Sequence, residues 1–155
     1  MPSVTFDDLK LILVPTDFSE SSELALRAAV RLAQTFHAAI EVFHVDVDPS
    51  LMLPPPLDAI SIPVLFDHVL AETAERLDRI AGEVRKAGVT CTSFDQLGRS
   101  HAAIVERARL VSAGLIVIGS HGRHGLTRAL LGSVAEKVVQ HAPCAVLVVP
   151  SSPAA

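Results

Sequence analysis

Residues 114–149, with the sequence GLIVIGSHGRHGLTRALLGSVAEKVVQHAPCAVLVV, contain the pattern that decides the fold. The runs LIVI at 115–118 and AVLVV at 145–149 are short and continuously apolar, as strands buried on both faces of a sheet are. The segment between them predicts a helix at 130–141, because its apolar residues recur at spacings of three and four. These residues are Leu131, Val134 and Val138. A strand, a helix and a second strand in this order predict a parallel βαβ unit.

The same alternation of apolar strands and amphipathic helices extends toward the N-terminus. Further strands are expected at residues 9–15, 39–45 and 89–97, and the last of these is more polar, which suits a sheet edge. Further helices are expected to run over residues 66–86 and to begin at Ser100. The first helix is expected to begin at one of three capping serines, which are Ser19, Ser21 and Ser22.

This order of elements predicts a Rossmann-like α/β fold formed by residues 1–155 as a single domain. Because crossovers between parallel strands are right-handed, we expect one doubly wound sheet of five parallel strands, in the order 3-2-1-4-5, with helices on both faces. The core-facing residues expected of the first helix are Leu24, Ala28, Leu32 and Phe36. Those expected of the second helix are Leu70, Thr73, Leu77, Ile80 and Val84.

Two segments lack a regular pattern. Residues 46–63 hold five prolines, which predicts a long surface loop, and residues 151–155 are expected to form a flexible tail. The two cysteines, Cys91 and Cys144, each lie in an apolar run, so we expect buried free thiols in a reducing compartment.

The composition excludes several classes of protein. A net charge of −4 argues against nucleic acid as a partner, because binding a phosphate backbone needs a basic face. The chain has no Trp or Tyr with which to stack unpaired bases. No apolar run reaches the roughly 18 residues of a membrane span, and the N-terminus MPSVTFDDLK does not resemble a signal peptide. We therefore expect a cytoplasmic protein that contacts neither nucleic acid nor membrane.

In the predicted sheet the strand order reverses once, between the first and fourth strands. Ligands of such sheets bind at that point, outside the carboxyl ends of the strands. Asp17 follows the first strand and therefore faces the glycine-rich segment that follows the fourth. The amides around Gly119 and Gly122 suit phosphate oxygens, and the start of the last helix at Gly132 and Ser133 suits a second phosphate. Arg123 and Arg128 could balance the charge.

Two stretches resemble the universal stress protein family over nearly the whole chain. GSHGRHGLTRALLGSVAEKVVQHAPCAVLVVP, at residues 119–150, is similar to the C-terminal signature of the family. ILVPTDFSESSELALRAAVRLA, at residues 12–33, is similar to its opening strand, Asp-containing loop and first helix. The spacing G-x2-G-x9-G-S marks the ATP-binding branch of the family, and this chain keeps it without a departure.

The resemblance implies a role for each matching residue. Thr16 and Asp17 would meet the nucleoside, and Val45 would offer its backbone to adenine. Residues 119–122 would line the ribose and first phosphates, and residues 132–134 would hold the outer phosphates. The full set of expected ligand-contacting residues is Pro15, Thr16, Asp17, Val45, Gly119, Ser120, His121, Gly122, Arg123, Gly132, Ser133 and Val134. ATP is the implied ligand, with Mg²⁺ able to accompany its phosphates, and the implied partner is a second copy joined through strand 145–149.

Three functions remain open at this point. A regulatory or stress-adaptive ATP-binding protein without fast catalysis is favoured, because the segment has no Walker lysine and no evident acid–base set. A weak ATPase or nucleotidyl-transferring enzyme and an interaction module with an empty cleft are the alternatives. Neither a metal site at His121 and His124 nor a triad of Ser133, His121 and Asp17 is expected, and His44 is assigned no role.

Overall fold

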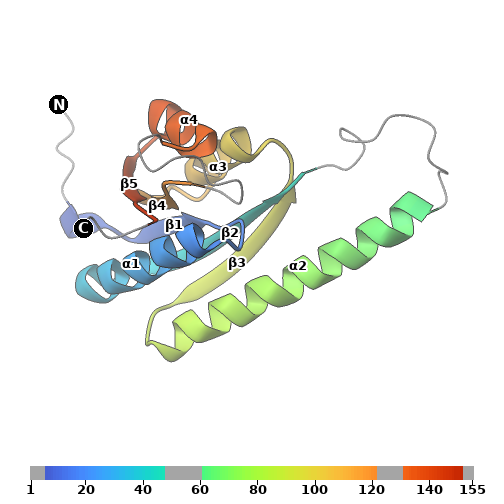
Figure 1. Ribbon diagram of the computed structural model, residues 1–155. Coiled ribbons are helices and arrows are strands. Elements are labelled where there is room, and N and C mark those ends of the chain that lie inside the picture. Colours follow the sequence, from blue (N-terminus) through green and yellow to red (C-terminus); the bar gives the residue numbers. More distant parts are fainter. Residues whose placement is uncertain (1–5, 48–60, 122–130, 152–155) are drawn as a thin grey trace.

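The computed structural model describes residues 6–47, 61–121 and 131–151 (Figure 1). The helices are a short 3-10 turn η1 (Phe6–Asp8), α1 (Glu20–Phe36), α2 (Ser61–Lys86), α3 (Ser100–Leu110) and α4 (Ser133–His141). The strands are β1 (Leu11–Pro15), β2 (Ala39–Asp46), β3 (Cys91–Leu97), β4 (Leu115–Gly119) and β5 (Ala145–Val149).

The described strands form one five-stranded sheet in the order β3-β2-β1-β4-β5, and every neighbouring pair is parallel. This confirms the predicted fold class and strand order. β1 lies at the centre, paired on one side with β2, where Pro15 lies opposite Phe43, and on the other with β4, where Ile12 lies opposite Leu115. The strand order therefore reverses between β1 and β4, as expected.

The hydrophobic core has two parts, one on each face of the sheet. Along β1, Ile12 and Val14 join the part that packs against α1 and α2, whereas Leu13 joins the part that packs against α3 and α4. All three side chains are fully buried, because each strand residue points to the face opposite its neighbour and helices cover both faces (Figure 1).

The buried face of α1 differs from the expected one. Ala25, Ala29 and Ala33 are buried, whereas Phe36 is 37% exposed and Leu24 is only half-buried. The small side chains face the sheet because they let the helix approach it closely, and the larger ones pack around the edge of the contact. In α2 the expected positions Thr73, Leu77 and Val84 are buried.

Two helix boundaries also differ from prediction. α2 begins at Ser61 and not at residue 66, and Pro63 lies in its first turn, where a helix needs no amide donor. β2 continues through Asp46, so the predicted loop 46–63 is shorter at both ends, and the rest of it lies outside the described residues.

α4 begins at Ser133 and not at 130, because Gly132 is extended, with φ −62° and ψ 149°, and forms the N-cap. Leu131 is accordingly exposed.

Both cysteines are free thiols, as predicted. Cys91 is buried in β3, and burial raises the pKa of its thiol to about 11. Cys144 is half-buried, and burial raises its pKa as well. In the described part of the chain, no helix combines the length and apolar character that crossing a membrane would require.

Candidate functional site

A cleft of about 640 Å³ opens at the carboxyl ends of β1, β2 and β4, beside the start of α4. Ten of the residues predicted from the sequence line it: Pro15, Thr16, Asp17, Val45, Gly119, Ser120, His121, Gly132, Ser133 and Val134. The other two, Gly122 and Arg123, lie outside the described residues, as does Arg128. The strand order brings these separate segments together, and their role as ligand contacts stays a prediction.

The turn between β1 and α1 is held by its own hydrogen bonds. The Phe18 amide donates to Thr16 Oγ1 at 3.0 Å, and the Ser19 amide donates to Asp17 Oδ1 at 3.0 Å. Ser19 then caps α1 by accepting a hydrogen bond from the Ser22 amide. Phe18 has a φ of 63°, an uncommon value for a residue with a side chain. The backbone beside Asp17 is therefore fixed locally.

Gly119 has a further reason to be glycine, beyond the ligand approach expected from the sequence. A Cβ there would lie 2.4 Å from Ser21 Oγ and 2.8 Å from the Ser21 backbone, so the missing side chain makes room for α1. Gly132 likewise has no room for a Cβ, which would lie 2.9 Å from the Ser120 carbonyl oxygen. Its amide donates to that same carbonyl at 2.7 Å. The two glycines thus set the packing of the segments that border the cleft.

The start of α4 presents positive charge to the cleft. Ser133, Val134 and Ala135 of its first turn line the cleft, whereas Glu136 of the same turn does not, and no side chain among the described residues caps the helix at Gly132. First-turn amides lack acceptors within their own helix, and the helix dipole adds a partial positive charge. An anion of the size of a phosphate group fits this position chemically.

A second polar group lies next to that helix start. Ser120 Oγ lies 2.8 Å from His121 Nδ1, and the Ser151 amide donates to Ser120 Oγ at 3.2 Å. Ser151 is thus held against the site, and of the predicted tail only residues 152–155 lie outside the described chain. His121 Nε2 is buried and has no hydrogen-bond partner among the described residues.

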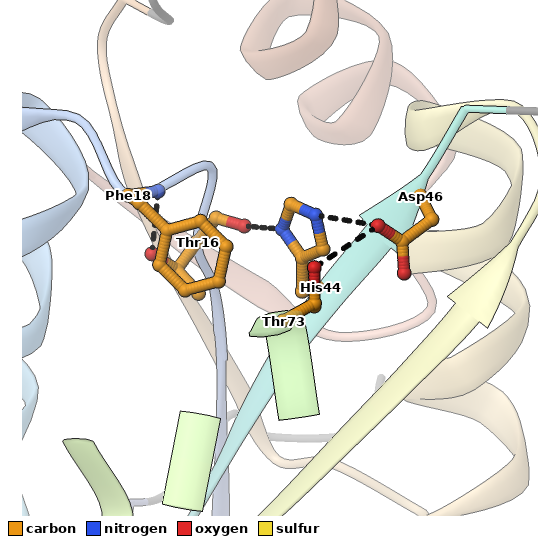
Figure 2. Close-up of polar contacts among 5 residues, drawn as sticks. All are labelled: Thr16, Phe18, His44, Asp46 and Thr73. Carbon is orange, nitrogen blue, oxygen red and sulfur yellow. Dashed lines mark hydrogen bonds and ion pairs between the residues drawn. The ribbon is translucent and has the colours of Figure 1, made fainter. Parts of the chain in front are cut away.

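The opposite end of the cleft is bordered by a cluster of ring and guanidinium groups that the sequence analysis missed. The Phe18 ring lies 4.6 Å from the His44 ring, and the Arg76 guanidinium lies 4.1 Å from the Phe18 centroid. His44 Nδ1 lies 2.7 Å from the Thr16 carbonyl oxygen (Figure 2). Because a carbonyl only accepts, Nδ1 must carry a proton and donate it. His44 therefore ties β2 to the turn that carries Asp17.

Asp46 completes this end of the cleft. Its Oδ1 lies 3.3 Å from His44 Nε2 and accepts a hydrogen bond of 3.5 Å from Thr73 of α2 (Figure 2). Its Oδ2 is buried and has no hydrogen-bond partner in the described part of the chain. The sequence analysis had placed Asp46 in a surface loop and Thr73 in the core, so it could not bring the two together.

Comparison with known proteins identifies the family. The model of the universal stress protein family matches residues 9–150. The chain belongs to the universal stress protein family. A curated relative, the universal stress protein MJ0531 of Methanocaldococcus jannaschii, is 37% identical over 90% of this chain and 81% of its own.

Solved structures of other universal stress proteins share the fold. MJ0577 of the same archaeon is 28% identical in the structural match, with a TM-score of 0.81 that covers 94% of this chain and 99% of MJ0577. A universal stress protein family protein from Arabidopsis thaliana, solved with AMP bound, is 18% identical, with a TM-score of 0.67 that covers 93% of each chain. Universal stress proteins of this fold therefore include at least one that holds a nucleotide.

Proposed function

We propose that this universal stress protein binds ATP, or a close adenosine nucleotide, in the cleft between β1 and β4, and acts in regulation or stress adaptation without fast catalysis. The observation that carries the proposal is the joining of two chemically different ends in one cleft. One end is the start of α4 at Ser133, with its unpaired amides, and the other combines the apolar side chains of Phe18 and Val45 with the polar group of His44 and Asp46. A nucleotide has the matching polarity, with phosphates at one end and a flat base at the other.

The cleft volume supports this reading. About 640 Å³ lies within the range of roughly 300–1,000 Å³ that is usual for small-molecule and cofactor sites. The ribose would lie between the two ends, beside the rigid turn that carries Asp17. The AMP named for the Arabidopsis neighbour belongs to the same chemical class.

The lining residues support binding more than catalysis. Among the described residues that line the cleft there is no lysine or arginine to clamp a transferring phosphoryl group. The pair Ser120 and His121 places a hydroxyl beside a base, which favours the alternative of a weak ATPase or nucleotidyl-transferring enzyme. Phosphate charge would be met mainly by backbone amides at the start of α4.

Mass analysis of the nucleotide that remains with the purified protein, followed over hours with added ATP and Mg²⁺, separates these functions. We expect intact ATP to stay bound, with little product. Steady release of ADP or AMP would support the enzyme instead. A chain that retains nothing and fails to bind added ATP would be an interaction module, which would contradict the proposal.

We also propose that two copies associate through β5, which is an edge strand of the described sheet. Leu147 is 39% exposed, and the strand carries no charged residue. An uncharged, apolar edge strand invites pairing with another chain, and two copies of the same edge can pair around a two-fold axis. The predicted cytoplasmic location stays a prediction.

A further inference from the structure

The end of β2 carries two polar side chains on a face of the strand that is otherwise apolar. Ile40 and Val42 of that face are fully buried in the core, and His44 and Asp46 follow them at every second position. His44 is 9% exposed and Asp46 is 8% exposed, so both are nearly as buried. Burying a polar group costs stability unless it is hydrogen-bonded, so the partners of His44 decide what it contributes.

His44 holds the residue at which β1 passes into the turn. The Thr16 amide donates to the Phe43 carbonyl at 2.8 Å, which continues the pairing of β1 with β2 by one bond. No backbone amide of the described residues donates to the Thr16 carbonyl, and His44 Nδ1 donates to it instead, at 2.7 Å (Figure 2). Both polar groups of the Thr16 backbone are thus bound by consecutive residues of β2.

The imidazole of His44 also supports the strained residue of the turn. Phe18 has a φ of 63°, a left-handed conformation that a residue with a side chain keeps only where its surroundings hold it. The Phe18 ring lies 4.6 Å from the His44 ring, and the Arg76 guanidinium of α2 lies 4.1 Å from its centroid. The other nitrogen of His44, Nε2, lies 3.3 Å from Asp46 Oδ1, which accepts from Thr73 of α2 (Figure 2). A closed ring of contacts therefore joins the turn, β2 and α2.

The turn held in this way is part of the cleft, which Thr16, Asp17 and Phe18 all line. We propose that His44 is a positioning residue for the nucleotide: by donating Nδ1–H to the Thr16 carbonyl, it keeps the turn in the strained conformation to which the nucleotide binds. The inference rests on the proposed function. His44 acts through the backbone and needs no contact with the ligand. A turn without this bond would relax, and binding would have to restore the strained conformation, which lowers affinity.

Two substitutions separate the two nitrogens of His44. In His44→Asn the side-chain amide nitrogen lies as many bonds from Cβ as Nδ1 does, so it can still donate to the Thr16 carbonyl. In His44→Gln the amide nitrogen corresponds to Nε2 and reaches Asp46 instead. Both variants lose the ring that packs against Phe18, so both should be less stable than the wild type. We expect His44→Gln to bind ATP about 10- to 100-fold more weakly than the wild type, and His44→Asn to restore most of that affinity.

A purely structural role would give a different result. The ATP affinity of the two variants would then follow their stability in urea unfolding, and not the nitrogen that each retains. His141→Gln is the matched control, because His141 is exposed at the end of α4 and its Nδ1 donates to the Lys137 carbonyl at 2.8 Å, outside the cleft. This control should bind ATP as the wild type does. Equal affinities of His44→Asn and His44→Gln would overturn the inference while leaving ATP binding intact.

A measurement on the wild type decides the question where a variant does not fold. If the bond from His44 to Thr16 favours ATP binding, ATP must favour that bond by the same factor. Exchange of the Nδ1 proton with water, followed by NMR with ¹⁵N-labelled histidine, should therefore slow about 10- to 100-fold at saturating ATP. Unchanged or faster exchange would overturn the inference alone. Failure of the wild type to bind ATP would overturn the proposed function and the inference with it.

Discussion

Gly119 and Ser21 lie so close together that a Cβ on Gly119 would overlap both Ser21 Oγ, at 2.4 Å, and the Ser21 backbone, at 2.8 Å. This contact joins the end of β4 to the first turn of α1, and the cleft opens next to it. The first glycine of the G-x2-G-x9-G-S pattern is therefore a packing residue. We therefore expect substitution of Gly119 to lower the free energy of unfolding even when no nucleotide is present.

We expect Gly119→Ala to destabilise the protein by about 1–3 kcal/mol, because the overlap is with backbone that has little room to move. Urea unfolding without nucleotide measures the loss. Gly82→Ala is the control: a Cβ there meets only the end of Arg85 at 4.0 Å, and alanine favours a helix over glycine by roughly 0.5–1 kcal/mol. Equal stability of the two variants would show that the contact does not constrain the fold.

Ser133→Ala should weaken ATP more than AMP. Ser133 is the first residue of α4 and lines the cleft, where its hydroxyl can donate to an outer phosphate. A hydrogen bond to a charged group contributes roughly 1.5–3 kcal/mol, so ATP affinity should fall by about one to two decades. Calorimetric titration with both nucleotides measures the difference. An equal loss for AMP would place Ser133 away from the outer phosphates.

The proposed dimer through β5 should dissociate in Leu147→Lys. Leu147 is 39% exposed and its neighbours Val146 and Val148 pack partly against the core, so this change places charge at the edge with the least damage to the monomer. Sedimentation at micromolar concentration should give a dimer for the wild type and a monomer for the variant. A wild-type monomer, or a variant that stays dimeric, would mean that β5 is not the interface.

Alkaline pH should destabilise the protein partly through Cys91. Burial raises the pKa of its thiol from 9.0 to about 11 in the folded state. Unfolding therefore releases a proton between pH 9 and 11, and the contribution of Cys91 to stability is full below pH 9 and declines as the pH rises. Urea unfolding at several pH values should show a smaller decline over this range for Cys91→Ala than for the wild type. Identical pH profiles would exclude this contribution.

The strand order could be predicted because the strands are continuously apolar and the helices between them are amphipathic. The buried face of α1 could not, because a pattern of hydrophobicity favours Leu24 and Phe36 over Ala25 and Ala29. Only the close approach of α1 to β4, which depends on Gly119, makes alanine the better residue on that face.

Only part of the cleft could be predicted from the sequence. Asp17, Gly119 and Gly132 stand out locally, and the strand order brings them to one cleft. The group of His44, Asp46 and Thr73 does not stand out, because the hydrogen bond between Thr73 and Asp46 spans 27 residues and that between His44 and Thr16 spans 28. Both contacts depend on how α2 and the β1–α1 turn meet the end of β2, which no local pattern encodes.

The most direct test of nucleotide binding at this site is the change in backbone amide chemical shifts when ATP is added to the ¹⁵N-labelled protein. The account predicts the largest changes at Thr16 and Asp17, near Val45, and through the first turn of α4 from Ser133. Residues at the far end of the sheet, such as Gly88 and Thr90, should not change. No changes at saturating ATP, or changes confined to that far end, would contradict it.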